Sequence, residues 1–131
     1  MDVLHGLADG LAAAPAVLVT VESIQGSAPR EAGAWMAVFA DGIVGTIGGG
    51  HLEHQAIAEA RRRLAGTPGP AQLRYALGPA LGQCCGGVVW LRYECVSAAD
   101  VPALRARLAP PLHPVALFGG GHVGHALARA L

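Results

Sequence analysis

The sequence predicts an α+β fold, in which a mixed or antiparallel sheet carries flanking helices. Three observations lead to this class. Short runs rich in β-branched residues recur along the chain and are typical of strands. Asp41-Gly42 stands between two such runs and indicates a hairpin turn. The next segment, residues 51–65, repeats its apolar residues at helical spacing, which predicts a helix that packs on the sheet.

The bulk properties favour a single globular domain. The chain has 131 residues, of which 53% are hydrophobic and 14% are charged. Its apolar runs are short, and none reaches the roughly 20 residues that cross a bilayer. Nine basic and nine acidic residues balance, which argues against a binder of duplex nucleic acid. The N-terminus lacks the basic start and apolar block of a signal peptide, so we expect a cytoplasmic protein with no membrane or nucleic-acid partner.

Eight elements are expected in the first 108 residues. Helices are expected where apolar residues recur every three to four positions, at residues 2–13, 51–65 and 101–108. Strands are expected at β-branched or alternating runs, at residues 16–21, 34–40, 43–47, 72–77 and 88–96. Cys95 lies inside the last strand and is expected in the core. Arg61-Arg62-Arg63 complements the dipole at the end of the long helix and is expected to be a solvated face.

The last part of the chain has a different pattern. A strand-like run leads into Gly119, Gly121 and Gly124, which have the spacing of a dinucleotide-binding fingerprint. The chain ends at Leu131, before the next strand and the acidic residue of that motif. We therefore expect a fragment of a longer protein in three parts, a domain at 1–108, a Pro-rich linker at 109–114 and an incomplete Rossmann-like start at 115–131. NAD(P) binding is then expected only in the full-length protein.

The stretch Gly45-Thr46-Ile47-Gly48-Gly49-Gly50-His51-Leu52-Glu53 joins the third strand to the long helix. Three consecutive glycines suit a tight turn or the close approach of a ligand. The N–H groups at a helix start attract anions, and a bare glycine loop leaves them accessible, so an anion site and a plain turn are both open. Glu53 in the first turn is explained by the helix dipole. His51 and His54 share a helix face but have no third ligand in the sequence, which favours surface histidines over a metal site.

Two further loops carry reactive groups. Ser27 and Arg30 lie in the polar loop 23–33, where an arginine can bind phosphate or carboxylate through two parallel hydrogen bonds. A surface hairpin with a solvated ion pair is the alternative. The loop 78–87 contains the adjacent thiols Cys84 and Cys85 before two glycines. A thiolate is a soft metal ligand and a nucleophile when its pKa is lowered, and two small buried residues are the alternative.

Three motifs together resemble a known family. Gln25-Gly26-Ser27-Ala28-Pro29-Arg30, the glycine stretch 45–53 and Leu81-Gly82-Gln83-Cys84-Cys85-Gly86-Gly87 are similar in order and spacing to the N-terminal domain of the XdhC/CoxI family of xanthine dehydrogenase accessory proteins. The likeness extends over nearly all of residues 10–95, and residues 115–131 resemble the start of the family's Rossmann-like domain. The resemblance implies an accessory chaperone rather than an enzyme. Such a protein binds the molybdenum cofactor, supports its sulfuration with a cysteine desulfurase and inserts it into a xanthine dehydrogenase-type molybdenum hydroxylase.

The site follows from the three motifs. The residues expected to bind molybdopterin transiently are Ser27, Arg30, Gly48, Gly49, Gly50, His51, Glu53, Gln83, Cys85, Gly86 and Gly87. Cys85 fits the family pattern better than Cys84 and is the expected contact to molybdenum or sulfur, and no catalytic residue is expected. Two other interpretations stay open, a fragment of an NAD(P)-dependent oxidoreductase and a non-catalytic interaction domain. The severed strand at the end of the chain also predicts a homo-oligomer.

Overall fold

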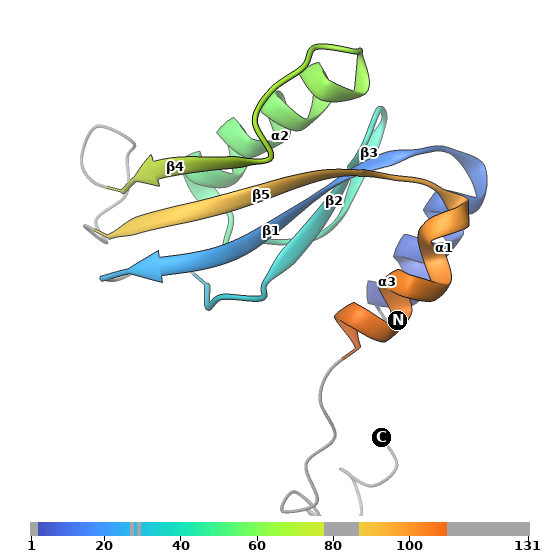
Figure 1. Ribbon diagram of the computed structural model, residues 1–131, viewed down its shortest axis with the longest axis horizontal. Coiled ribbons are helices and arrows are strands. Elements are labelled where there is room, and N and C mark those ends of the chain that lie inside the picture. The colour runs from blue at the N-terminus through green and yellow to red at the C-terminus, as the bar shows by residue number, and fades with distance from the viewer. Residues whose placement is uncertain (1–2, 27, 29, 78–86, 110–131) are drawn as a thin grey trace, which may run out of the picture.

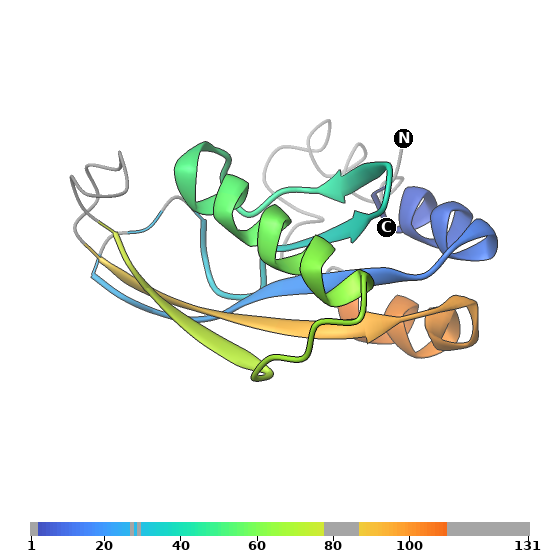
Figure 2. The same cartoon turned by 90° about the horizontal axis from the view of Figure 1, so that it is seen from above.

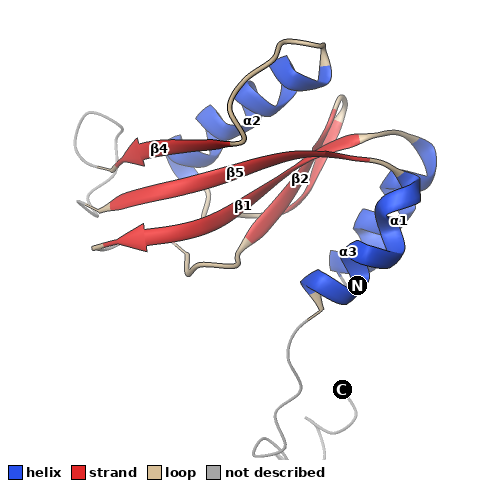
Figure 3. Cartoon of the chain, viewed as in Figure 1, coloured by secondary structure: helices blue, strands red, loops and turns tan. Residues whose placement is uncertain are grey.

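The computed structural model describes residues 3–26, 28, 30–77 and 87–109. Their elements, in chain order, are α1 (Val3–Ala13), β1 (Ala16–Gln25), β2 (Trp35–Phe39), β3 (Gly42–Gly45), α2 (Gly50–Leu64), β4 (Gln72–Ala76), β5 (Val88–Val96), the short 3-10 helix η2 (Ala98–Asp100) and α3 (Val101–Leu108). The expected α+β class is confirmed (Figure 3). The expected Rossmann-like start at 115–131 lies outside the described residues.

The five strands form one antiparallel sheet in the order β3-β2-β1-β5-β4. Helix α2 lies across one face of this sheet, whereas α1 and α3 pack together at one end of the other face (Figures 1 and 2). Asp41 and Gly42 form the turn between β2 and β3, as the sequence predicts. No helix of the described part of the chain is long and apolar enough to span a bilayer.

Each face of the sheet carries its own hydrophobic cluster. On the α2 face, strand residues pack against the helical stripe, and its most buried members include Val17, Val19, Met36, Leu52 and Leu91. On the opposite face, residues of β1 and β2 pack against α1 and α3, with Leu7, Leu11, Leu18, Phe39 and Leu104 among the buried members. The alternation of side chains along each strand supplies both clusters from the same sheet.

Two strand boundaries differ from the sequence prediction. Strand β1 continues to Gln25 through a bulge between Val21 and Ser23, and it pairs with β5 as far as Val88. Strand β3 ends at Gly45, where φ is +83° and a Cβ atom would lie 2.7 Å from the carbonyl oxygen of Trp35. The sequence cannot reveal the bulge, because its extra residue is specified by the register with β5, which is distant in the chain.

Cys95 is exposed, so its expected place in the core is wrong. Its neighbours on the same face, Leu91 and Tyr93, are buried. Strand β4 stops pairing with β5 where Gln72 meets Arg92, and the end of β5 therefore lacks a neighbouring strand on that side. Alternating apolar residues in a central strand predict that the side chains on one face are buried. This prediction fails for residues beyond the end of a shorter neighbouring strand.

The arginine cluster at the end of α2 is also only partly a solvated face. The side chain of Arg63 is 8% exposed, whereas that of Arg62 is 57% exposed. The guanidinium of Arg63 donates from Nε to Glu59 at 2.8 Å and from Nη1 to the carbonyl oxygen of Pro70 at 2.6 Å. It also lies over the ring of Tyr93, 4.4 Å from the centroid. Arg63 thus joins α2, the following loop and β5.

Candidate functional site

The described ends of the three motif loops lie at one end of the sheet. The last residue of β1, Gln25, pairs with Val88 at the start of β5. The N–H of Leu77 donates to the carbonyl oxygen of Gly87 at 2.7 Å, so the β4–β5 connection leaves and returns beside this point. Helix α2 begins at the same end of the molecule, as Figures 1 and 2 show. The topology therefore brings segments that are far apart in the sequence to one edge.

Arg30 links the first two motifs. Its Nη1 donates to the carbonyl oxygen of Thr46, 3.3 Å away, in the loop that precedes α2. Its Nε and Nη2 atoms each lie 3.0 Å from Oε1 of Glu31. The Arg30 side chain is 38% exposed, so its guanidinium is accessible to an anion from solvent. Both the first loop and the glycine loop thus present polar groups to the same region.

The glycine loop is closed by the chain's own side chains. Oε1 of Glu53 accepts hydrogen bonds from the Thr46 hydroxyl at 2.6 Å and from the N–H groups of Ile47 and Gly49, each at 3.0 Å. The Thr46 hydroxyl oxygen accepts a further bond from the N–H of Gly48 at 3.0 Å. Glu53 and Thr46 therefore occupy the N–H groups of Ile47, Gly48 and Gly49, and only donors further along the helix start are left for an anion.

The consecutive glycines are explained by backbone geometry. Gly48, Gly49 and Gly50 have φ values of +120°, +75° and +69°. Residues with a side chain rarely adopt these angles, so glycine is required to turn the loop around the Glu53 carboxylate. The glycines therefore shape an internally bonded turn at the start of α2.

The pKa of Glu53 is lowered from its ordinary value. Burial raises the pKa, but the hydrogen bonds from the Thr46 hydroxyl and from the N–H groups of Ile47 and Gly49 favour the charged form and together outweigh it. Glu53 also lies in the first turn of α2, where the helix dipole favours a negative charge. The carboxylate is therefore ionised at neutral pH.

Groups suited to an anion are present beside this closed loop. The first four N–H groups of an α-helix have no acceptor within the helix. In α2, the first two of these groups belong to Gly50 and His51. Arg30 adds an accessible positive charge. His51 and His54 are both exposed, and their rings stack with centroids 6.5 Å apart, so they do share a face. The described residues contain no group of three side chains that could hold a metal ion.

Several of the expected site residues cannot be placed. Ser27, Gln83, Cys84, Cys85 and Gly86 lie outside the described residues, as do Gly119, Gly121 and Gly124. Gly87 is described and buried, and it contributes its carbonyl oxygen to the bond from Leu77. Thr46, which was not among the predicted site residues, joins the candidate site through its hydroxyl group. The sequence feature that could have indicated Thr46 is a hydroxyl residue seven positions before Glu53, at the start of a glycine turn.

The chain is similar to proteins of one known family and to a solved structure. The model of the XdhC and CoxI family matches residues 11–76, which include the first two motifs. The uncharacterized protein YqeB of Escherichia coli (strain K12) is 35% identical over 120 residues, covering 88% of this chain and 20% of YqeB. A crystal structure of a xanthine dehydrogenase from Bacillus halodurans superposes with a TM-score of 0.64 at 25% identity, covering 81% of this chain and 36% of that one.

The chain therefore spans about a fifth of the length of YqeB and about a third of the length of the solved Bacillus protein. The family match extends over half of the chain and contains both Arg30 and the glycine loop with Glu53. By this match, the chain belongs to the XdhC and CoxI family.

Proposed function

We propose that this chain is part of an accessory protein that binds the molybdenum cofactor and delivers it to a molybdenum hydroxylase of the xanthine dehydrogenase type. The observation that carries the proposal is the hydrogen bond from Arg30 to Thr46, which joins the first motif loop to the glycine loop. Membership of the XdhC and CoxI family supports the link to a hydroxylase, as does the similarity to the solved Bacillus protein, which is described as a xanthine dehydrogenase.

The described residues fit a cofactor that carries a phosphate. Arg30 has an accessible guanidinium that can bind a phosphate through parallel hydrogen bonds. The first-turn N–H groups at Gly50 and His51 add the positive end of α2. Glu53 has a positioning role, because its carboxylate fixes the loop that aims this turn. When bound, the cofactor supplies a molybdenum centre, for which the Cys85 thiol is the proposed metal or sulfur contact.

The proposal includes the partners that the family resemblance implies. A molybdenum hydroxylase subunit receives the cofactor, and a cysteine desulfurase supplies the sulfur. Self-association of the chain belongs to the same proposal. In this scheme, the chain holds and positions the cofactor and does not carry out the hydroxylation.

Arg30→Ala tests the proposed role of Arg30. Loss of a charge-assisted contact to phosphate is expected to weaken cofactor retention about 10- to 100-fold. Retention is measured by gel filtration of the chain with cofactor, followed by fluorescence of the oxidised pterin. Activation of a cofactor-free hydroxylase by the same variant is the second readout. Arg74→Ala, which removes an exposed arginine from β4, is the matched control and should behave like the unaltered chain.

A second variant, Cys85→Ser, separates cofactor transfer from a scaffold role. We expect it to lower hydroxylase activation while cofactor retention by Arg30 is preserved. If Arg30→Ala and Cys85→Ser both leave retention and activation unchanged, the chain acts as a non-catalytic interaction domain instead.

A further inference from the structure

A pocket of about 780 Å³ lies on the sheet face opposite α2. Helices α1 and α3 cover only one end of this face, and the pocket occupies the part beside them. Its floor includes Trp35 and Thr20, which are cross-strand neighbours on β2 and β1. The Thr20 hydroxyl is buried and has no hydrogen-bond partner among the described residues. The volume falls in the usual range for a small-molecule site, about 300–1,000 Å³.

The pocket is continuous with the motif loops. Arg30 and Thr46, the two residues whose hydrogen bond joins the first loop to the glycine loop, are both part of its wall. A ligand whose phosphate binds at Arg30 can therefore extend over the sheet. The sequence motifs do not reveal this surface, because many of its other residues come from β1, β2, β5 and α3, outside the motifs.

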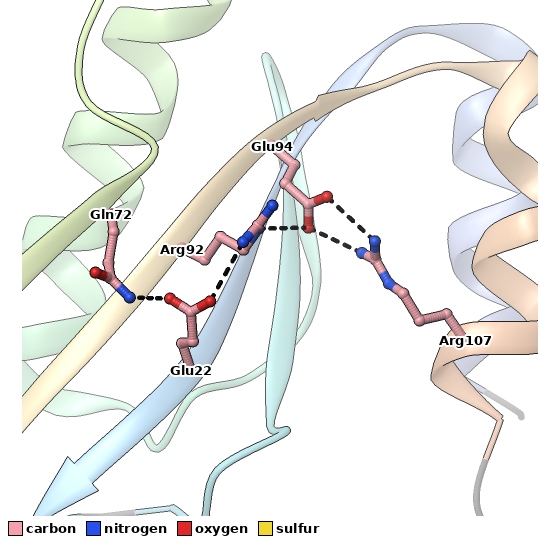
Figure 4. Close-up of polar contacts among 5 residues, drawn as sticks. All are labelled: Glu22, Gln72, Arg92, Glu94 and Arg107. Atoms are coloured by element: carbon pink, nitrogen blue, oxygen red, sulfur yellow. Dashed lines mark hydrogen bonds and ion pairs between the residues drawn. The ribbon is translucent and has the colours of Figure 1, made fainter.

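A chain of polar side chains crosses this surface from β4 to α3 (Figure 4). Gln72 donates to Glu22, and Nη1 of Arg92 donates to Oε1 of Glu22 at 3.3 Å. Nε of Arg92 lies 3.8 Å from Glu94, which is too long for a hydrogen bond. Arg107 binds Glu94 with two bonds, of 3.2 and 2.8 Å. Glu22 follows Val21 at the β1 bulge and faces Arg92 on this side of the sheet.

Arg92 is the loosely held member of this chain. Its side chain is 49% exposed, and its contacts to Glu22 and Glu94 are both long. Each carboxylate also has another donor, Gln72 for Glu22 and Arg107 for Glu94. A ligand can therefore take hydrogen bonds from Arg92 without leaving either carboxylate unpaired. The carboxylates keep acceptor capacity, because a carboxylate offers about four lone-pair sites.

We propose that this pocket binds a planar heteroaromatic ring whose edge carries N–H donors next to a carbonyl acceptor. The Trp35 side chain offers an aromatic surface, Glu94 and Glu22 accept from the N–H groups, and Arg92 donates to the carbonyl oxygen. A pterin ring has this edge. The inference rests on the function proposed above and deepens it, since it assigns the ring of the cofactor to the pocket and its phosphate to Arg30.

Pterin itself is the probe that tests the pocket, because it has the ring but no phosphate. Binding to the full 131-residue chain is measured by isothermal titration calorimetry, with lumazine, which lacks the amino group, as the matched ligand. The chain should bind pterin more tightly than lumazine. Arg92→Gln should weaken pterin binding about 5- to 50-fold, and Arg92→Lys should restore it only in part.

Arg74→Gln is the matched control variant, because Arg74 on β4 pairs with Trp90 on β5 and does not line the pocket. Glu94→Gln replaces one acceptor oxygen of the carboxylate by an NH2 donor. It should therefore reduce the preference for pterin over lumazine. Thermal melting identifies any variant that has lost its fold. If pterin does not bind, or if Arg92→Gln and Glu94→Gln bind it as the unaltered chain does, the inference is overturned. That result would not decide the proposed function, which is tested separately by cofactor retention in the Arg30→Ala variant.

Discussion

Among single residues, Glu53 determines the conformation of the glycine loop. One of its oxygen atoms accepts bonds from the hydroxyl of Thr46 and from the N–H groups of Ile47 and Gly49. This is the arrangement that an anionic ligand would be expected to make at the start of a helix. The chain therefore supplies its own anion at this turn, and a ligand must use the groups around it.

Removal of the Glu53 carboxylate should destabilise the fold. Glu53→Ala leaves two backbone donors and the Thr46 hydroxyl without their acceptor, and we expect the free energy of unfolding to fall by about 1–3 kcal/mol. Glu53→Gln keeps one acceptor oxygen and should cost less. Urea titrations of the three proteins measure the difference. Equal stability of the alanine variant and the unaltered chain would show that water replaces the carboxylate at no cost.

The contribution of Glu53 should also depend on pH. Its pKa is lower in the folded state than the ordinary value of 4.5, so the unfolded chain binds this proton more tightly than the folded protein does. The stabilisation is present in full above the unfolded pKa and is lost as the pH falls through the folded pKa. We expect the stability difference between the unaltered chain and Glu53→Gln to be constant near pH 7 and to shrink below about pH 5. A difference that grows on acidification would contradict this sign.

At the scale of elements, α1 packs closely on the sheet through a glycine. A Cβ atom at Gly10 would lie 2.5 Å from the ring of Phe39, which is 6% exposed and cannot move freely. At Gly6 of the same helix, a Cβ atom would make an ordinary contact of 3.5 Å with Val44. The two glycines therefore differ in the space above them and not in their secondary structure.

The same substitution should have opposite effects at these two positions. Gly6→Ala is expected to stabilise the protein by about 0.5–1 kcal/mol, because alanine is the better helix former. Gly10→Ala is expected to destabilise it by about 1–3 kcal/mol, because the added methyl group forces Phe39 or α1 to shift. Thermal and urea unfolding of both variants provide the measurement. Stabilisation of both would mean that α1 adjusts to the methyl group without loss of packing.

The C-terminal end of α2 is held by a buried charge. The pKa of Glu59 is lowered, first by the hydrogen bond from Arg63, and the Arg63 guanidinium lies over Tyr93. The hydroxyls of Tyr75 and Tyr93 are hydrogen-bonded at 2.5 Å, and burial is the main cause that raises the pKa of both. This cluster fastens α2 to β4 and β5.

Arg63→Met should therefore destabilise the protein far more than Arg62→Met. The first change keeps an unbranched apolar side chain but leaves Oε2 of Glu59 and the carbonyl oxygen of Pro70 without their donor. We expect a loss of about 2–4 kcal/mol for Arg63→Met and within about 0.5 kcal/mol for Arg62→Met. Urea unfolding of the two variants measures the loss of stability in each. Equal losses would show that the Arg63 side chain is as solvated as the sequence predicts.

At the scale of the whole molecule, one sheet serves two separate clusters. Leu52 belongs to the cluster under α2, and Leu104 belongs to the cluster under α1 and α3 on the opposite face. They share no partner in either cluster. Their contributions to stability should therefore be independent.

A double-mutant cycle tests this independence. Leu52→Val and Leu104→Val should each lower the free energy of unfolding by about 1–2 kcal/mol. The double variant should lose the sum of the two values to within about 0.5 kcal/mol. Denaturant titrations of all four proteins provide the measurement. A coupling of more than about 1 kcal/mol would mean that the two faces respond as a single core.

The elements were predictable because their signals are local. Periodic apolar residues give α2, and Asp41-Gly42 gives the hairpin. The failures at Cys95 and Arg63 have tertiary causes, namely a short neighbouring strand and a loop that folds back over a guanidinium. The motifs identified Arg30 and the glycine loop. They could not identify Arg92. Arg92 and Thr46 line the same pocket only because of the strand order and register of the sheet, which the motifs do not encode.

The turn before α2 has a consequence for how this protein assembles. Its bonds join residues no more than seven positions apart. Closing so short a loop takes a small fraction of a microsecond and costs little chain entropy. The turn can therefore form while the nascent chain is still emerging, before β4 or β5 has been synthesised. The same turn should keep its conformation when residues 46–53 are placed at the start of a helix in another protein.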